Sequence, residues 1–381
     1  MLPDLNQIIE LRHQLHQHAE FSGEEKVTSD IIATFLSKYS PTQIIRELGG
    51  HGVAAIFEYA SAGPIVVFRC ELDALPIQEK NANLPYRSRH EGKSHKCGHD
   101  GHMAIVAGLA SVISQKSYKQ GKVILLFQPA EETGAGARKV MADQSWIDLA
   151  PTHIFALHNL PGFNKNRIIV REGPFNAAVI SICIKLQGVV THAAEPEKGA
   201  NPALAIATIL SEVDRLNIPD DSKPDFTLIT PIHLTMGDKA YGTSAGYGEV
   251  HFTARCWTTE KLRTLVGIIK NNVSEICQKF NLVCAFETWE EFASTNNNGE
   301  MVALVKKAAR TNGLQIDTME TPFRWGEDFG LFTQAFPGAI FGLGAGEKTP
   351  ALHNEFYDFP DEIISNGISM FTTIADEILG Q

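Results

Sequence analysis

The sequence predicts an α/β protein with a mixed, mostly parallel sheet flanked by helices and a smaller α+β domain inserted into it. Two observations support this class. Outside the middle of the chain, short continuous apolar runs alternate with helical stretches, as expected for strands covered on both faces. Between about residues 174 and 293, alternating polar and apolar strands appear instead. The 381 residues also exceed what one hydrophobic core usually organises, so two domains are expected.

The larger domain is predicted from the alternation of its apolar and helical segments. The apolar runs expected to form strands are residues 53–57, 65–68, 123–127, 154–157 and 339–343. The segments with helical spacing are residues 4–20, 24–39, 103–114 and 300–311. Strands that alternate with helices favour parallel pairing. We therefore expect residues 1–173 and 294–381 to form one discontinuous catalytic domain.

The inserted domain is predicted from a β-α-β-β-α-β order of segments. These are residues 179–186, 202–216, 226–234, 249–256, 261–279 and 282–287. Such an order suits a ferredoxin-like sandwich with its helices on one face. Gly173-Pro174 and the polar run 294–299 are typical of hinges. Residues 174–293 are therefore expected to form a separate domain, inserted between two parts of the larger one.

Composition excludes several classes of function. The formal net charge is -11 and no basic patch stands out, which argues against a nucleic-acid or anionic-membrane partner. No run approaches the roughly 20 apolar residues of a membrane span, and the polar N-terminus lacks the apolar core of a signal peptide. Six scattered cysteines form no disulfide framework. We expect a cytoplasmic protein in which all cysteines but one are small core residues.

Chemically useful side chains follow four of the apolar runs in the larger domain. They are Asp73, the Glu131-Glu132 pair, His158 and, after a short loop, His353. The carboxyl ends of parallel strands lie on one edge of a sheet, and ligands bind in the crevice there. Residues far apart in the sequence are therefore expected to meet at this edge.

Cys97 and His99 stand two residues apart, just before the helix expected from Met103. A thiolate and an imidazole are good ligands for zinc and related divalent ions. The following helix N-terminus is expected to lower the pKa of the Cys97 thiol. His102 is a competing ligand, but its place one turn into the helix favours a supporting role. The alternative is a buried cysteine beside a solvated histidine cluster.

The adjacent carboxylates Glu131 and Glu132 are the most informative pair. Neighbouring carboxylates repel each other, so a strand end that leads into glycines is a poor place for them without a cation. One of them can bind a metal while the other accepts a proton from a metal-activated water. The alternative is a solvated surface pair.

The remaining candidates each have a plain structural alternative. His158 and His353 are either metal ligands or hydrogen-bonded polar residues. Asp73 is either a helix or turn cap or a carboxylate that orients a metal ligand. His192 in the inserted domain is unremarkable by itself; the functional hypothesis makes it a lid histidine that closes on the substrate.

With these residues in view, the sequence resembles the aminoacylase and carboxypeptidase superfamily of co-catalytic metallohydrolases. It is most similar to the branch of hippurate hydrolases, N-acetyl-diaminopimelate deacetylases and auxin–amino acid conjugate hydrolases. The matching segments span nearly the whole chain in the expected order: residues 15–20 (LHQHAE), 72–77 (LDALPI), 97–103 (CGHDGHM), 127–132 (FQPAEE), 157–159 (LHN), 326–329 (GEDF) and 352–354 (LHN).

The resemblance implies a zinc-exopeptidase-like fold and a role for each candidate. The implied ligands of two divalent ions, zinc or manganese, are Cys97, His99, Glu132, His158 and His353. Glu131 matches the general acid/base and Asp73 the orienting carboxylate. The inserted domain matches a lid through which such enzymes form homodimers. His192 matches a lid histidine that helps to stabilise the oxyanion.

Three departures from the family pattern concern substrate binding. Position 71 is Glu where the branch usually has Asp. Residues 241–246 (YGTSAG) replace an Asn-Val-Ile-Pro segment, and Arg324-Trp325 precedes residues 326–329 where smaller residues are common. We therefore expect an intact catalytic shell and a rebuilt end of the substrate pocket.

The sequence thus predicts a metal-dependent amidohydrolase acting on N-acyl amino acids or similar small amides. The first alternative is a dipeptidase or aminopeptidase that uses the same metals on a peptide substrate. The second is a catalytically inactive metal-binding dimerisation module. A hydrolase with Cys97 as a thiol nucleophile is disfavoured.

Overall fold

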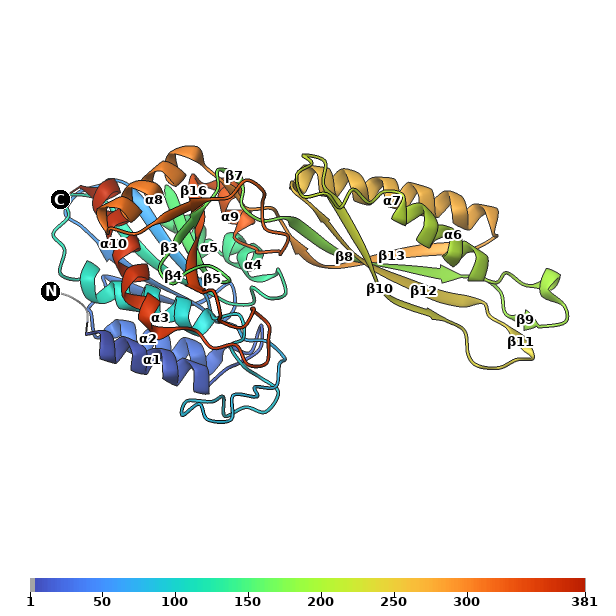
Figure 1. Ribbon diagram of the computed structural model, residues 1–381, viewed down its shortest axis with the longest axis horizontal. Helices are drawn as coiled ribbons and strands as arrows, with labels where there is room; N and C mark the ends of the chain where they lie inside the picture. The colour runs from blue at the N-terminus through green and yellow to red at the C-terminus, as the bar shows by residue number, and fades with distance from the viewer. Residues whose placement is uncertain (1–3, 381) are drawn as a thin grey trace. The chain divides into compact units, whose positions relative to one another are not determined.

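The computed structural model describes residues 4–380, which divide into two compact units (Figure 1). The larger unit reaches Phe175 and also contains Thr295–Glu320 and the chain from Asp328 onward. The smaller unit contains Asn176–Ser294 and, in addition, Thr321–Glu327. In the described part of the chain, no helix is both long and apolar enough to span a bilayer.

The return of residues 321–327 to the smaller unit is absent from the sequence-based boundaries. Main-chain contacts attach this segment: the Ala177 N–H donates to the Phe323 carbonyl at 2.8 Å. The Arg255 guanidinium also donates to the Arg324 carbonyl at 2.7 Å. A short segment held in this way has no hydrophobic period of its own, so sequence patterning does not reveal it.

The larger unit is built on an eight-stranded sheet of order β1-β2-β4-β3-β5-β16-β6-β15. Its strands are β1 (Gln43–Leu48), β2 (Gly52–Glu58), β3 (Ile65–Glu71), β4 (Lys122–Gln128), β5 (His153–Pro161), β6 (Ile168–Val170), β15 (Ile316–Thr318) and β16 (Gly338–Gly346). The pairs β3–β4, β3–β5, β5–β16 and β6–β15 are parallel, and the other three pairs are antiparallel. The predicted mixed, mostly parallel sheet is confirmed.

Helices pack against both faces of this sheet. One layer contains α1 (Leu5–Gln17), α2 (Lys26–Ser37), α3 (His99–Ile113), α8 (Gly299–Thr311) and α10 (Ile364–Leu379). The other contains α4 (Gly136–Ala142), α5 (Gln144–Leu149) and α9 (Gly330–Ala335). In β4, Val123, Leu125 and Phe127 join the core shared with α3, whereas Ile124 and Leu126 are also buried but point to the opposite face. Burial on both faces explains the continuous apolar runs.

The two predicted hinges pair with each other. Gly173–Pro174 forms β7 and Asn296–Asn297 forms β14, and these strands are antiparallel neighbours. Gly173 has a φ of +74°, a conformation that glycine adopts without steric cost. The segments that precede Asn176 and follow Ser294 therefore lie side by side in the larger unit.

The smaller unit is an antiparallel four-stranded sheet of order β10-β12-β8-β13 with two helices on one face. Its main elements are β8 (Ala178–Gln187), α6 (Ala203–Asp214), β10 (Thr227–Met236), β12 (Tyr247–Cys256), α7 (Thr259–Lys279) and β13 (Val283–Phe292). The short elements are β9 (Thr191–His192), β11 (Thr243–Ser244) and a 3-10 turn at Pro196–Lys198, with a second such turn, Asp361–Ile363, in the larger unit. This is the ferredoxin-like order, so the predicted fold class is confirmed.

Candidate metal centre

Four neighbouring parallel strands bring the predicted residues of the larger unit to one sheet edge. In the order β4-β3-β5-β16, Glu131 and Glu132 follow β4 and Asp73 follows β3. His353 lies in the loop after β16, whereas His158 lies inside β5, which continues to Pro161. The expectation that parallel strand ends gather these side chains is met, although His158 belongs to a strand and not to the loop after it.

Cys97 and His99 reach the same place from the start of α3. The helix begins at His99, four residues before the expected start, and is preceded by Gly98 with φ +90°. A Cβ atom at Gly98 would lie 2.4 Å from Asn159 Nδ2, so only glycine fits between the helix and β5. The glycine turn therefore presents two candidate ligands, one on each side of it.

Backbone carbonyls orient the two buried histidines. His99 Nδ1 lies 2.9 Å from the Asp73 carbonyl oxygen, and His158 Nδ1 lies 2.9 Å from the Asn159 carbonyl oxygen. A carbonyl only accepts, so Nδ1 carries the proton in both rings and Nε2 faces the site. His158 Nε2 lies 3.6 Å from Cys97 Sγ. The two rings are thus held with the nitrogen that binds metals pointing inward.

The carboxylates of Glu131 and Glu132 lie close to His99. His99 Nε2 lies 3.8 Å from Glu132 Oε1 and 4.0 Å from Glu131 Oε2. Asp73 lies behind them: its Oδ2 accepts from the Glu132 N–H at 2.9 Å and from the Ser22 hydroxyl at 2.6 Å. Asp73 therefore connects His99 with Glu132 through its main-chain carbonyl and its carboxylate.

Two residues at the site have left-handed backbone conformations despite having side chains. Ala130, which precedes Glu131, has φ +52°, and His353 has φ +64°. Such conformations cost on the order of 1–3 kcal/mol and persist where surrounding contacts enforce them. The Glu25 carboxylate accepts from the Ala130 N–H at 2.8 Å, and the His353 N–H donates to the Lys96 carbonyl at 2.7 Å. His353 Nε2 thereby lies 3.9 Å from Glu132 Oε1.

These side chains form overlapping groups of the kind that hold metal ions. Cys97, His99 and His158 form one group, and Cys97, Glu132 and His353 form another; in each, the ligand atoms lie within 4.8 Å of one another. His99 Nε2 and Asp73 Oδ1 are buried without a hydrogen-bond partner among residues 4–380. Buried polar atoms are normally satisfied, so the donor set fits divalent cations of the zinc class, which accept sulfur, nitrogen and carboxylate ligands.

In the site without a metal, burial and neighbouring side chains shift the pKa values of three of these side chains. Burial, and then the Glu132 carboxylate, raises the pKa of the Cys97 thiol well above its usual value. The expected lowering of this pKa by the helix N-terminus is therefore wrong for the site without a metal, where burial is the largest cause of the shift. Burial opposes a charge on His99, yet Cys97 and Asp73 raise the pKa of His99 well above its usual value. Burial, and then His102, lowers the pKa of His158 to about 3. A cation binding here would displace protons from Cys97 and His99.

The ring of His102 lies next to these ligands and is held by Glu71 and Asn159. Its Nδ1 lies 2.7 Å from Glu71 Oε2, and its Nε2 accepts from the Asn159 N–H at 3.0 Å. Both ring nitrogens are thus engaged, although Glu71, His99 and His102 also form a group whose ligand atoms lie within 4.8 Å of one another. Glu71, which stands where the family usually has Asp, also forms an ion pair with Arg69. Burial disfavours its charged carboxylate, yet Arg69 and His102 hold the pKa of Glu71 well below its usual range.

Asp328 is a site residue that sequence reasoning did not assign. It is fully buried and accepts from Arg69 at 2.7 Å, from Gln128 at 2.8 Å and from the Ala137 N–H at 2.8 Å. Its own N–H lies 3.3 Å from Glu131 Oε1. The resemblance of segment 326–329 to the family could have pointed to Asp328, but only the fold places this residue beside Glu131.

A second buried network supports the start of α3. Asp100 Oδ2 accepts from Arg12 at 2.8 Å and contacts His16 Nδ1 at 2.9 Å. His16 Nε2 contacts Glu79 at 3.1 Å, and Lys96 donates to the same Glu79 oxygen at 2.7 Å. This network joins α1 to the residues on either side of Cys97.

His192 lies in the smaller unit and is exposed. It is in β9, where it pairs with Thr243 of β11, inside the unusual segment 241–246. The Ala194 N–H donates to His192 Nδ1 at 3.0 Å, which leaves Nε2 as the N–H donor of a neutral ring. Arg324, also in this unit, forms an ion pair with Asp221.

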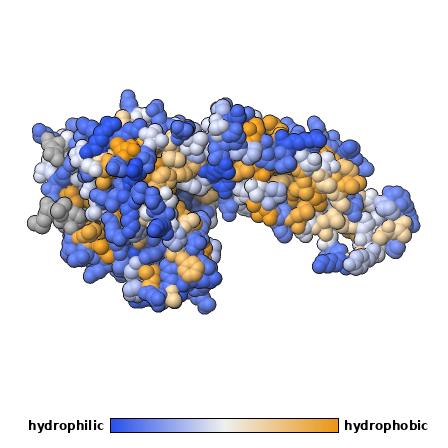
Figure 2. Space-filling model, viewed as in Figure 1, coloured by the Kyte–Doolittle hydropathy of each residue, from blue (hydrophilic) through white to orange (hydrophobic). Residues whose placement is uncertain are grey.

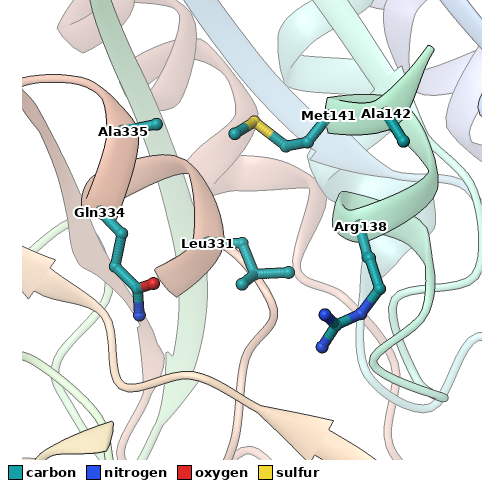
Figure 3. A pocket seen from close by; sticks show the side chains of 6 residues that line it. All are labelled: Arg138, Met141, Ala142, Leu331, Gln334 and Ala335. Carbon is teal, nitrogen blue, oxygen red and sulfur yellow. The ribbon is translucent and has the colours of Figure 1, made fainter. Parts of the chain in front are cut away.

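A further pocket in the larger unit lies between α4 and α9 (Figure 3). Arg138, Met141, Ala142, Leu331, Gln334 and Ala335 line it. None of the predicted catalytic or metal-binding residues lines this pocket, so it is not the metal centre.

Comparison with known proteins identifies the family. Residues 67–377 match the profile of Peptidase family M20/M25/M40, which is most of the chain. The chain belongs to this family. It is therefore a metal-dependent hydrolase, as the sequence predicts, and the resemblance to co-catalytic metallohydrolases is confirmed.

Several relatives of this M20-family chain are named as deacetylases. It is similar to the N-acetylcysteine deacetylase of Bacillus subtilis, with 28% identity over 374 residues that cover 98% of this chain and 97% of the relative. An N-acetyl-L-cysteine deacetylase of the same organism is 32% identical over 340 residues, covering 89% of this chain and 80% of the relative. The N-acetyldiaminopimelate deacetylase of Lactobacillus helveticus is 28% identical over 378 residues, covering 96% and 95%.

A solved structure has the same fold over the full length. It is a Bacillus subtilis protein described as a dinuclear metal binding peptidase of the M20 family, with a TM-score of 0.84 and 27% identity, covering 98% of each chain. The fold of an aminobenzoyl-glutamate utilization protein from Klebsiella pneumoniae is also shared, with a TM-score of 0.72 at 19% identity over 97% of this chain and 96% of the other.

Proposed function

We propose that this M20-family hydrolase cleaves the amide bond of N-acyl amino acids. The observation that carries the proposal is the meeting of the Glu131-Glu132 pair with His99 at the end of four parallel strands. Attack of water on an amide can use one carboxylate that binds a metal ion and an adjacent carboxylate that acts as the base. The similarity to relatives named N-acetylcysteine deacetylase and N-acetyldiaminopimelate deacetylase supports a substrate of this class.

The proposed centre holds two divalent ions, zinc or manganese. Cys97, His99 and His158 offer one set of ligands, and Cys97, Glu132 and His353 offer a second that shares the cysteine. Bound ions of this kind lower the pKa of water and polarise a carbonyl oxygen. The two overlapping ligand sets support a pair of ions, as does the similarity to the Bacillus subtilis structure described as dinuclear metal binding.

Glu131 is the proposed general base and acid. Its carboxylate takes a proton from the attacking water as the water oxygen bonds to the amide carbon, and then returns that proton to the nitrogen as the carbon–nitrogen bond breaks. The Asp328 N–H holds Glu131 Oε1, which leaves Oε2 directed to the His99 side of the site. Asp73 holds His99 and the main chain of Glu132 in place.

His192 is the proposed donor to the oxyanion of the tetrahedral intermediate. The Nε2–H of its neutral ring is the group that such a role needs, because an oxyanion accepts hydrogen bonds. Removing one oxyanion donor typically costs about two to three orders of magnitude in rate. The contact between His192 and the unusual segment 241–246 supports a changed substrate preference near this residue.

We also propose that the protein forms a homodimer through the smaller unit. β10 is an edge strand, and it exposes Ile232, Leu234 and Met236. Figure 2 shows hydrophobic residues on the surface of this unit. An edge strand with exposed apolar side chains is prone to pair with another chain. Sedimentation of the purified protein should give twice the chain mass; a monomer at micromolar concentration would contradict the proposal.

The test of the activity is a substrate panel measured with added Zn²⁺ or Mn²⁺. Acetyl- and benzoyl-amino acids should be hydrolysed faster than free-amine dipeptides. Preference for the dipeptides would instead support a dipeptidase or aminopeptidase. A chelator should abolish turnover and added metal should restore it; activity that survives metal removal would support a Cys97 nucleophile and overturn the metal mechanism.

A further inference from the structure

The smaller unit contains a second group of potential metal ligands. Its sheet has one face covered by α6 and α7, and the side chains of Ile182, Ile184 and Val250 point into that core. Cys183 and His251 point to the other face, because successive side chains of a strand alternate. They are direct partners across β8 and β12.

Glu249 completes the group from the same face. It stands two residues before His251 on β12, so both side chains leave the strand in the same direction. Two ligands spaced by one residue on one strand, with a third directly opposite on the next strand, put three donor atoms over one point of a sheet. The donor atoms of Cys183, Glu249 and His251 lie within 4.8 Å of one another.

The contacts converge on a single nitrogen. His251 Nε2 lies 3.6 Å from Cys183 Sγ and 3.2 Å from Glu249 Oε2. That nitrogen carries at most one proton, whereas a carboxylate oxygen only accepts and sulfur is a weak partner. One N–H shared between two acceptors satisfies neither fully. A cation satisfies all three donor atoms together.

The spacings also fit the dimensions of a metal site. Tetrahedral zinc with bonds of about 2.3 Å to sulfur and about 2.05 Å to nitrogen or oxygen separates its ligands by about 3.6 Å (sulfur to nitrogen) and about 3.3 Å (nitrogen to oxygen). The observed separations are 3.6 Å and 3.2 Å. Cys183 and Glu249 therefore each stand at coordination distance from His251 Nε2.

Neighbouring side chains hold the group in this arrangement. The Tyr247 hydroxyl donates to Glu249 Oε1, which leaves Oε2 directed at His251. The Trp289 ring lies parallel to the His251 ring, with centroids 6.3 Å apart, and His233 approaches the same ring edge-on at 5.4 Å. Cys183 is fully buried, while His251 and Glu249 are partly open to solvent. An ion can therefore enter from the open side.

We propose that Cys183, Glu249 and His251 form a binding site for a zinc-class divalent cation, distinct from the centre in the larger unit. Thiolate, imidazole and carboxylate together select zinc over magnesium or calcium, which prefer oxygen ligands alone. A water or the adjacent His233 completes the coordination. The cation ties β8 to β12 in the middle of the sheet.

The first test is the zinc content of reduced, dialysed protein. Cys183→Ser and Glu249→Gln should each contain one equivalent less zinc per chain than the wild type. Cys284→Ser is the matched control, because this thiol packs against the helix-covered core of the same sheet and should leave the content unchanged. Equal zinc content in the wild type and in folded Glu249→Gln would overturn the proposal and leave a hydrogen-bonded group only.

The second test distinguishes the two cysteines that would bind metal. Co²⁺ added to Cys97→Ala should still produce a thiolate-to-cobalt absorption band, because Cys183 remains. The double variant Cys97→Ala/Cys183→Ser should lose the band, and circular dichroism checks that it is folded. Absence of the band in Cys97→Ala itself would overturn the proposal, whatever the protein hydrolyses.

Discussion

Replacing Glu131 with glutamine isolates proton transfer from metal binding. The side chain keeps its size, and its amide oxygen can still accept from the Asp328 N–H, which lies 3.3 Å from Glu131 Oε1. The buried surroundings are therefore retained, while the group loses its ability to take a proton from water at neutral pH. Folding and metal content should change little.

The expected rate loss follows from the role. A positioned general base contributes roughly two to four orders of magnitude to rate, which corresponds to about 3–5 kcal/mol of activation free energy. kcat for an N-acetyl amino acid should fall by that factor, with KM less affected. Metal content is measured on the same samples by elemental analysis.

Glu132→Gln is the control for this experiment. Glu132 belongs to a group with Cys97 and His353 whose atoms lie within 4.8 Å, so its variant should lose metal as well as activity. Glu131→Gln with full metal content and unchanged kcat would refute the assignment of the base. Loss of metal in Glu131→Gln equal to that in Glu132→Gln would show that Glu131 is a ligand.

Three further predictions concern stability and metal affinity. Asp100→Asn breaks a fully buried pair with Arg12 and should cost about 3–5 kcal/mol of unfolding free energy in urea; a loss below about 1 kcal/mol, the range of exposed pairs, would contradict this. Burial disfavours the charged carboxylate of Glu79, yet His16 and Lys96 lower its pKa from 4.5 to about 2. The contribution of Glu79 to the unfolding free energy is therefore complete above pH 4.5 and lost as the pH falls toward 2. In Glu79→Gln, the unfolding free energy should fall less steeply with decreasing pH than in the wild type; equal slopes in the two proteins would disprove this. Metal binding should weaken as the pH falls, because protons compete for Cys97; chelator competition that is independent of pH would contradict this.

Sequence patterning located the strands of the site but missed several elements around it. The predicted helices and strands correspond to the long, periodic segments. α10 (Ile364–Leu379) is absent from the prediction, although its buried Ile364, Ile368 and Phe371 have helical spacing. The short strands β6 and β15 have three residues each, too few for a period to be recognised.

Features that depend on near neighbours in the chain could be predicted without a structure. The spacing of Cys97 and His99, the adjacency of Glu131 and Glu132, and the apolar runs buried on both faces are local properties. Residue type and period therefore predict an α/β sheet with these side chains at strand ends, and the segments that resemble the family add the expectation of a metallohydrolase.

The way in which these segments meet depends on the packing of the whole fold. The order β4-β3-β5-β16 joins strands that are remote in sequence, and it sets which carboxylate lies near which histidine. It also places Asp328 beside Glu131 and buries Arg69 between two carboxylates. Such contacts depend on the packing of the whole sheet, whereas periodicity reports only the environment of one segment at a time. The candidate site residues could thus be proposed from the sequence, but their mutual distances and supporting contacts required the fold.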